Sequence, residues 1–227
     1  TWQCWALGRY RVEDALDMLA IALGQSRDEL RRKPATLTVV NSNSPLRLDI
    51  PMGEGLLAMA RAGQPVAMTP FTLSGAMSPV TIAGALTQQN AEALALITLA
   101  QIAAPGAPVL YGGFTSNVDM RTGSPAFGTP EYAKAQIASG QLARKYRVPF
   151  RSSNVTASNT VDVQAAYESG MSLWSTIMGG AHLIEHAAGW LEGGLVSSYE
   201  KFVLDADQLG VLHSLAEGID LSENGQA

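Results

Sequence analysis

The chain has 227 residues, of which 47% are hydrophobic and 15% are charged. This composition suits a folded domain with a sizeable core and excludes a disordered or fibrous chain. The formal net charge is -5, which offers no basic field for a phosphate backbone. The most apolar stretch, residues 91–104, contains Glu92 and Gln101 and is shorter than the roughly 20 apolar residues of a membrane span. We therefore expect no role in binding nucleic acid or in crossing a membrane.

The ends of the chain and its cysteine content give two further expectations. No secretion signal precedes the first apolar pattern, and Cys4 is the single cysteine, so an internal disulfide and a multi-cysteine metal site are both excluded. A cytoplasmic, reducing location is expected. Because the chain starts at Thr1 and stops in a polar tail over residues 218–227, we expect it to be a piece of a longer protein.

Short apolar runs alternate with longer helical patterns along most of the sequence. A leading helical segment is expected over residues 1–34, with its helix around residues 12–23, and βα repeats over residues 35–217 of a single domain, residues 1–227. The expected strands are residues 35–41, 65–71, 108–112, 148–152 and 181–186. The expected helices are residues 51–62, 79–103, 130–146, 161–178 and 198 to about 217.

Strict alternation of strands and helices predicts a parallel sheet covered by helices, because parallel strands need crossover connections. An open doubly wound sheet and a (β/α)8 barrel both fit this pattern. A complete barrel typically takes about 250 residues, and only five βα units are expected here. We predict an α/β fold of the (β/α)8 TIM-barrel type, with this chain forming a partial barrel.

The segments that follow the expected strands differ from those at the opposite ends. They combine small residues with hydroxyl, amide and aromatic side chains, and they cover residues 41–47, 69–79, 111–121, 152–158 and 186–194. The segments that precede the strands read as ordinary solvated turns. Since ligands bind at the carboxyl ends of parallel strands, this asymmetry predicts one functional face.

Aromatic and polar candidates fall on this face. The aromatic side chains are Phe71, Tyr111, Phe114 and Trp190. Among the polar candidates, Asp119 and Glu192 lie in glycine-rich loops, His186 ends the last expected strand, and an Asp119–Arg121 ion pair that holds the loop is an equally good interpretation of Asp119. By contrast, Glu92, Glu131 and Glu168 fall within helices, where exposed or capping roles are expected.

One segment of the sequence matches a metal-binding motif. Residues 182–186 match the H-x-x-E-H pattern, which binds zinc only on a helix, where positions four apart share a face. Here the segment follows two glycines and reads as a strand, which would place the two histidines about 13 Å apart. We therefore predict no bound metal.

Three long blocks resemble the trimethylamine methyltransferase family. They are YGGFTSNVDMRTGSPAFGTPEY (residues 111–132), TPFTLSGAMSPVTIAGAL (69–86), and HAAGWLEGG (186–194) with YEKFVLD (199–205). The resemblance covers residues 41 to about 209. Members of the family are (β/α)8 barrels of roughly twice this length, so the resemblance implies the middle part of such a barrel.

The resemblance also implies an activity. Family members transfer a methyl group from a tertiary or quaternary amine to the cobalt of a corrinoid bound by a separate protein. Nothing in the sequence marks a pyrrolysine, which implies the pyrrolysine-free branch that demethylates betaine-type amines. The D-x-H-x-x-G motif of a cobalt-binding protein is absent, so a cognate corrinoid protein is the expected partner.

Quaternary ammonium chemistry suggests roles for the candidate residues. Such a cation donates no hydrogen bond, so aromatic faces from Phe71, Tyr111, Phe114 and Trp190 would hold it, with charge from Glu192 or Asp119. Donors for a substrate carboxylate would be Arg121, Asn43 and Asn117, and His186 would bind substrate or tune its surroundings.

Two alternatives and one further expectation stay open. A different barrel enzyme, a lyase or an aldolase, would need a Schiff-base lysine or convergent metal ligands, but the candidate lysines lie in turns or helices. A catalytically incomplete piece that serves only as a binding module is the second alternative. Exposed sheet edges would also favour self-association into a homo-oligomer.

Overall fold

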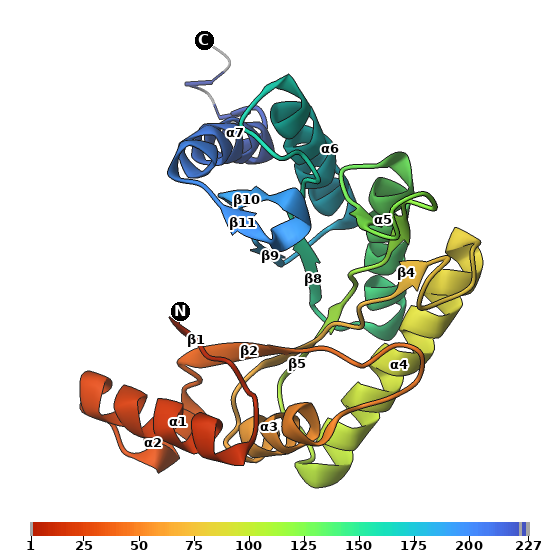
Figure 1. Cartoon of the computed structure of the whole chain (residues 1–227). Coiled ribbons are helices and arrows are strands. Elements are labelled where there is room, and N and C mark those ends of the chain that lie inside the picture. Colours follow the sequence, from red (N-terminus) through yellow and green to blue (C-terminus); the bar gives the residue numbers. More distant parts are fainter. Residues whose placement is uncertain (1, 223, 226–227) are drawn as a thin grey trace.

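The computed structural model describes residues 2–222 and 224–225, and its centre is a curled parallel sheet with helices on the outer side (Figure 1). Every neighbouring pair of strands in the six-stranded sheet is parallel. In spatial order the strands are β1 (Trp2–Gln3), β2 (Thr36–Val40), β3 (Val66–Met68), β5 (Val109–Gly112), β8 (Phe150–Ser153) and β9 (Leu183–Glu185). This mixed α/β arrangement is a half-barrel, which is compatible with part of a (β/α)8 barrel.

The sheet has six strands, whereas five were expected, and the additional strand is β1. This strand of two residues pairs in parallel with β2 and lies in the leading segment that was expected to be helical. A strand this short carries no periodic signal, because its existence depends on pairing with residues more than thirty positions away.

The helices cover one side of the sheet. They are α1 (Arg9–Leu23), α2 (Arg27–Arg32), α3 (Ile50–Arg61), α4 (Ile82–Ala103), α5 (Pro130–Tyr146), α6 (Val163–Gly179) and α7 (Tyr199–Glu217). The helix starts follow local capping chemistry. Thr81 accepts the N–H of Gly84 (3.2 Å), so α4 begins after Thr81 rather than at Pro79, where a helix was expected. The predicted polar tail, residues 218–227, lies partly outside the described residues.

The loops at the carboxyl edge contain regular structure that the sequence pattern did not indicate. The strands β4 (Leu73–Ser74), β6 (Ser116–Val118) and β7 (Pro125–Ala126) form a small sheet. The strands β10 (Trp190–Leu191) and β11 (Val196–Ser197) form a hairpin around the 3-10 turn η1 (Glu192–Gly194). These pieces give the loops a fixed shape.

Alternate residues of each strand face opposite sides of the sheet. Val40, Val66 and Met68 pack with Leu56 and Met59 of α3 in the core between sheet and helices. On the next strands, Tyr111 and Phe150 pack with Ala93 and Ala143 of α4 and α5. The intervening strand positions therefore face the inner side of the curl.

Two helical glutamates correct the expectation of exposed or capping side chains. Glu92 is 4% exposed, and its carboxylate accepts hydrogen bonds from Ser44 Oγ (2.7 Å) and the Leu46 N–H (2.9 Å). Glu168 is 8% exposed and is likewise hydrogen-bonded to a loop. Helical periodicity could not reveal this, because the donors come from loops distant in sequence. None of the helices that the described residues form combines the length and hydropathy required of a bilayer crossing.

The contact between α5 and α6 yields a stability prediction. A Cβ atom at Gly140 in α5 would lie 2.0 Å from the carbonyl oxygen of Gly179 in α6. By contrast, a Cβ atom at Gly170, elsewhere in α6, would meet nothing within 4 Å. Gly140→Ala should lower the free energy of unfolding by about 1–3 kcal/mol through overpacking. Gly170→Ala should raise it by about 0.5–1 kcal/mol, because alanine favours helix. Urea unfolding measures both, and equal effects would contradict the close helix contact.

Candidate ligand-binding site

A pocket of about 940 Å³ lies along the inner side of the sheet and at its carboxyl edge. Successive strands and the loops after them contribute its walls. The residues that line it are Gln3, Trp5, Val39, Asn41, Ser42, Asn43, Ser44, Thr69, Phe71, Met77, Phe114, Arg151, Leu183, Ile184, Glu185, His186 and Trp190. This is the position at which parallel α/β folds bind ligands.

Aromatic rings form one wall of the pocket. The ring of Phe114 lies 5.3 Å from Phe71, 6.2 Å from Trp190 and 5.3 Å from Phe127, measured between centroids. Phe127 in turn lies 6.0 Å from Trp190 at nearly a right angle. Phe71, Phe114 and Trp190 line the pocket, and the faces of aromatic rings attract cations.

A buried ion pair forms the floor of the pocket. Arg151 on β8 is 1% exposed, and its Nε donates to Glu185 Oε2 on β9 (3.1 Å), with a second, shorter contact from Nη2. The Arg151 guanidinium also lies over the Phe114 ring, 5.6 Å from its centroid. Among the described residues, Nη1 of Arg151 and Oε1 of Glu185 have no hydrogen-bond partner. The pair therefore retains one unused donor and one unused acceptor of opposite charge.

His186 lies beside this pair. Its ring centroid is 4.3 Å from that of Trp190, and its Nδ1 lies 3.3 Å from Ser153 Oγ. Although the residue is exposed towards the pocket, desolvation of the ring, and secondarily the charge of Arg151, lowers the pKa of His186 to about 3. The imidazole is therefore neutral at pH 7.

The structure brings together five of the predicted site residues. Phe71, Phe114, Trp190, His186 and Asn43 all line the pocket. The Asn43 side chain also shapes its own loop, since Oδ1 accepts the N–H of Asp49 (2.9 Å).

The other predicted site residues lie elsewhere. Tyr111 faces the helices, where its hydroxyl donates to Asn90 Oδ1 (3.1 Å) and burial raises its pKa to about 12. Asn117 on β6 accepts a hydrogen bond from Thr129 Oγ1 (2.8 Å). Glu192 is in η1, where its N–H donates to the Ser158 carbonyl (2.9 Å).

Asp119 and Arg121 belong to an outer turn. The Asp119 carboxylate accepts the backbone N–H of Arg121 (2.8 Å) and the Thr122 hydroxyl (3.1 Å), and these hydrogen bonds hold the pKa of Asp119 below its usual value. Asp119 thus organises its loop, as the alternative interpretation required, but through the Arg121 backbone instead of its guanidinium. Arg121 itself is exposed.

The sequence interpretation missed Arg151 and Glu185. A signal was available, because each is a charged residue inside a short strand, and alternation places Arg151 opposite to the helix-facing Phe150. The partnership itself depends on the parallel register of β8 and β9, which the sequence does not state.

A lyase or an aldolase would need convergent metal ligands or a Schiff-base lysine, and the geometry gives little support to either. The H-x-x-E-H segment forms β9 with its flanking histidines, and the described residues contain no group of three or more His, Cys, Asp or Glu side chains that could hold a metal. Lys201 is fully buried on α7, where its Nζ donates to Ser169 Oγ (2.6 Å) and pairs with Asp205. An ion-paired lysine outside the pocket does not suit Schiff-base chemistry.

The curled parallel sheet with an aromatic-lined pocket at its carboxyl edge defines a mixed α/β protein of the half-barrel kind, with its pocket where such folds bind ligands. The family model described as trimethylamine methyltransferase (MTTB) matches residues 1–227, and the chain belongs to this family.

Curated relatives extend this assignment. The chain is 42% identical over 223 residues to a glycine betaine methyltransferase of Desulfitobacterium hafniense, covering 98% of this chain and 46% of that protein. It is 34% identical to trimethylamine methyltransferase MttB of Methanosarcina thermophila, covering 93% of the chain and 44% of the relative. It is 35% identical to a proline betaine:corrinoid methyltransferase of Eubacterium limosum, covering 84% of the chain and 40% of that protein. The chain thus spans about half the length of the curated relatives that it matches.

The environment of His186 gives a prediction on protonation. In a proton NMR titration, the His186 imidazole should stay neutral down to about pH 4 and titrate near pH 3. The unfolded chain protonates this group near pH 6.5, so His186 makes folding less favourable as the pH falls from 6.5 towards 3. A His186 midpoint near 6.5 would contradict the lowered pKa.

Proposed function

We propose that this chain contributes the amine site of a methyltransferase that passes a methyl group from a betaine-type quaternary amine to a corrinoid carried by a partner protein. The names of the relatives include glycine betaine, trimethylamine and proline betaine methyltransferases, and one names a corrinoid as acceptor. The observation that carries the proposal is the pocket in which an aromatic wall meets a buried pair of opposite charges.

The pocket complements a zwitterion. A quaternary ammonium group donates no hydrogen bond and is held best by aromatic faces, which Phe71, Phe114 and Trp190 supply. We assign the substrate carboxylate to Nη1 of Arg151, the unused donor of the buried pair, in place of the exposed Arg121. Oε1 of Glu185 then provides negative charge for the ammonium end.

Methyl transfer of this kind asks for little proton movement. When bound, a corrinoid would supply the nucleophile for the methyl group, and the N–C bonding pair would stay on the departing amine. The amine leaves as a neutral tertiary amine, so no general acid is required. A neutral His186 suits this role, since it offers one donor and one acceptor for orientation without adding a positive charge near the ammonium.

The work of the protein residues is therefore binding and orientation. The aromatic wall fixes the ammonium end, Arg151 fixes the carboxylate end, and together they determine the direction of the N–CH₃ bond. Rings that surround the ammonium also exclude water from the reacting carbon. Among the candidates, we assign contact with substrate to Phe71, Phe114, Trp190, His186 and Asn43.

A substrate series tests the proposed activity. The full chain is assayed with free cob(I)alamin and with the cognate corrinoid protein as acceptors, using glycine betaine, proline betaine, trimethylamine and tetramethylammonium as donors. We expect the carboxylate-bearing amines to react with the highest kcat/KM. Faster demethylation of tetramethylammonium or trimethylamine would contradict the zwitterion site.

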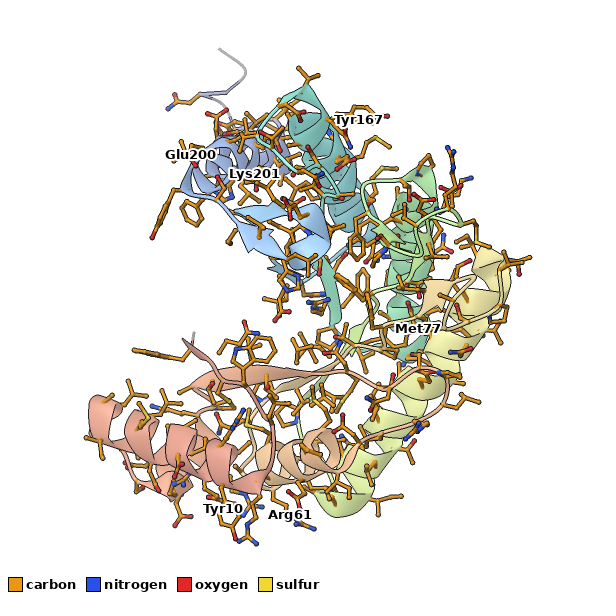
Figure 2. The ribbon with its side chains drawn as sticks, in the orientation of Figure 1. Tyr10, Arg61, Met77, Tyr167, Glu200 and Lys201 are labelled. Carbon is orange, nitrogen blue, oxygen red and sulfur yellow. The ribbon has the colours of Figure 1, made fainter. Side chains whose placement is uncertain are left out.

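Arg151→Lys tests the carboxylate contact without removing the partner of Glu185. Lysine retains the charge but loses the planar fork of donors. The kcat/KM for glycine betaine should fall about 10-fold or more, which corresponds to about 1.4 kcal/mol, while that for tetramethylammonium should change less than about twofold. A matched control is Tyr10→Leu, since Tyr10 is 84% exposed on the outer side of α1 (Figure 2). Equal losses for both amines would refute the assignment of Arg151.

A further inference from the structure

We propose that Glu168 is a positioning residue that fixes the aromatic wall of the pocket from beneath, through the loop that follows β8. The inference rests on the proposed function in one respect, the contact between Trp190 and the amine. Glu168 itself lies on α6 and is not among the residues that line the pocket. Its effect on substrate would pass entirely through Trp190 and Phe127.

The Glu168 carboxylate organises residues 156–158. Its Oε2 accepts hydrogen bonds from the backbone N–H groups of Ala157 (2.8 Å) and Ser158 (3.0 Å), and from the Thr156 hydroxyl. Its Oε1 accepts from Gln164 Nε2 (2.8 Å). Consecutive backbone donors that converge on one carboxylate oxygen fix the orientation of the whole loop.

The opposite side of the same loop holds Trp190. The carbonyl oxygen of Thr156 accepts the indole Nε1–H of Trp190 (3.1 Å) and the N–H of Gly193 (3.0 Å). The carbonyl oxygen of Ser158 accepts the N–H of Glu192 (2.9 Å). The donors of the loop therefore point to Glu168 and its acceptors to the Trp190 segment, so that rotation of these peptide units would disturb both.

A second contact joins Glu168 to Gly128, in the turn that follows Phe127. A Cβ atom built on Gly128 would lie 2.4 Å from Cγ of Glu168, and the φ of Gly128 is +73°. The turn after Phe127 therefore rests directly on the Glu168 side chain, which only glycine permits. Because Phe127 and Trp190 pack 6.0 Å apart, one buried glutamate supports both rings.

A double-mutant cycle tests this coupling in the full chain. Glu168→Leu removes the acceptor for the three donors of residues 156–158, and Trp190→Leu removes the ring. We expect each variant to raise the dissociation constant for glycine betaine by a similar factor, within about twofold, and the double variant to bind no more weakly than Trp190→Leu. Independent losses that multiply in the double variant, or a Glu168→Leu variant with unchanged affinity when Trp190→Leu weakens binding, would overturn the positioning role.

Two further variants separate positioning from a general loss of stability. Glu168→Gln keeps an acceptor oxygen towards the loop and should restore affinity to within about threefold of the parent. Gln64→Leu is the matched control: Gln64 is also fully buried, accepts the N–H groups of Ala35 (3.0 Å) and Thr36 (3.3 Å), and lies at the opposite end of the sheet. It should lower Tm but leave the affinity for glycine betaine unchanged. An equal loss of affinity in Gln64→Leu would refute a specific link.

An NMR measurement tests the link without substrate. In protein labelled with nitrogen-15, the indole N–H of Trp190, assigned through Trp190→Phe, should be protected from hydrogen exchange. Glu168→Asp, which retains the charge but withdraws the carboxylate from the loop, should reduce that protection about 10-fold or more, whereas Gln64→Leu should not. Unchanged protection would overturn the inference. If instead Trp190→Leu binds glycine betaine normally while the NMR result holds, the proposed substrate site fails and the positioning of Trp190 stands.

Discussion

The shape of the pocket depends on polar side chains that helices insert beneath the loops of the carboxyl edge. Glu92 of α4 accepts hydrogen bonds from the loop after β2, and Gln89 of the same helix accepts from Thr115 after β5 (2.6 Å). Glu168 of α6 holds the loop after β8, and Asp205 of α7 accepts the N–H of Gly189 after β9 (2.9 Å). These loops would otherwise carry buried hydroxyl or backbone donors without partners, which costs about 1–3 kcal/mol each.

This arrangement explains how much of the protein the sequence could predict. Helices with a local start signal form at the expected positions because capping is a short-range interaction. An example is α5, which begins at Pro130 directly after its cap residue Thr129. The parallel sheet followed from alternation alone. The strand β1 and the small sheet of β4, β6 and β7 did not, since each piece is stabilised by pairing with distant residues instead of by its own periodicity.

The lining of the pocket was predicted in part for the same reason. Phe71, Phe114, Trp190 and His186 line it because they follow strands, and all loops after parallel strands meet at one edge. Asp119 and Arg121 also follow a strand, but they lie in an outer turn closed by local hydrogen bonds. Position along the chain gives the edge of the sheet on which a residue lies, whereas its direction there depends on contacts that only the fold supplies.

The buried ion pair is not an arrangement that stability alone favours in a protein core. Replacing such a pair by apolar side chains is often neutral or stabilising, because desolvation of two charges offsets their attraction. Arg151 and Glu185 are therefore weak candidates for a purely stabilising role, and their Nη1 and Oε1 atoms have no hydrogen-bond partner among the described residues. Under the proposed function, the carboxylate of a zwitterionic amine would accept a hydrogen bond from Nη1, and its ammonium group would offset the charge of Oε1 without donating a hydrogen bond. The same charges disfavour a ligand with only one sign, so the pair would select the substrate as well as hold it.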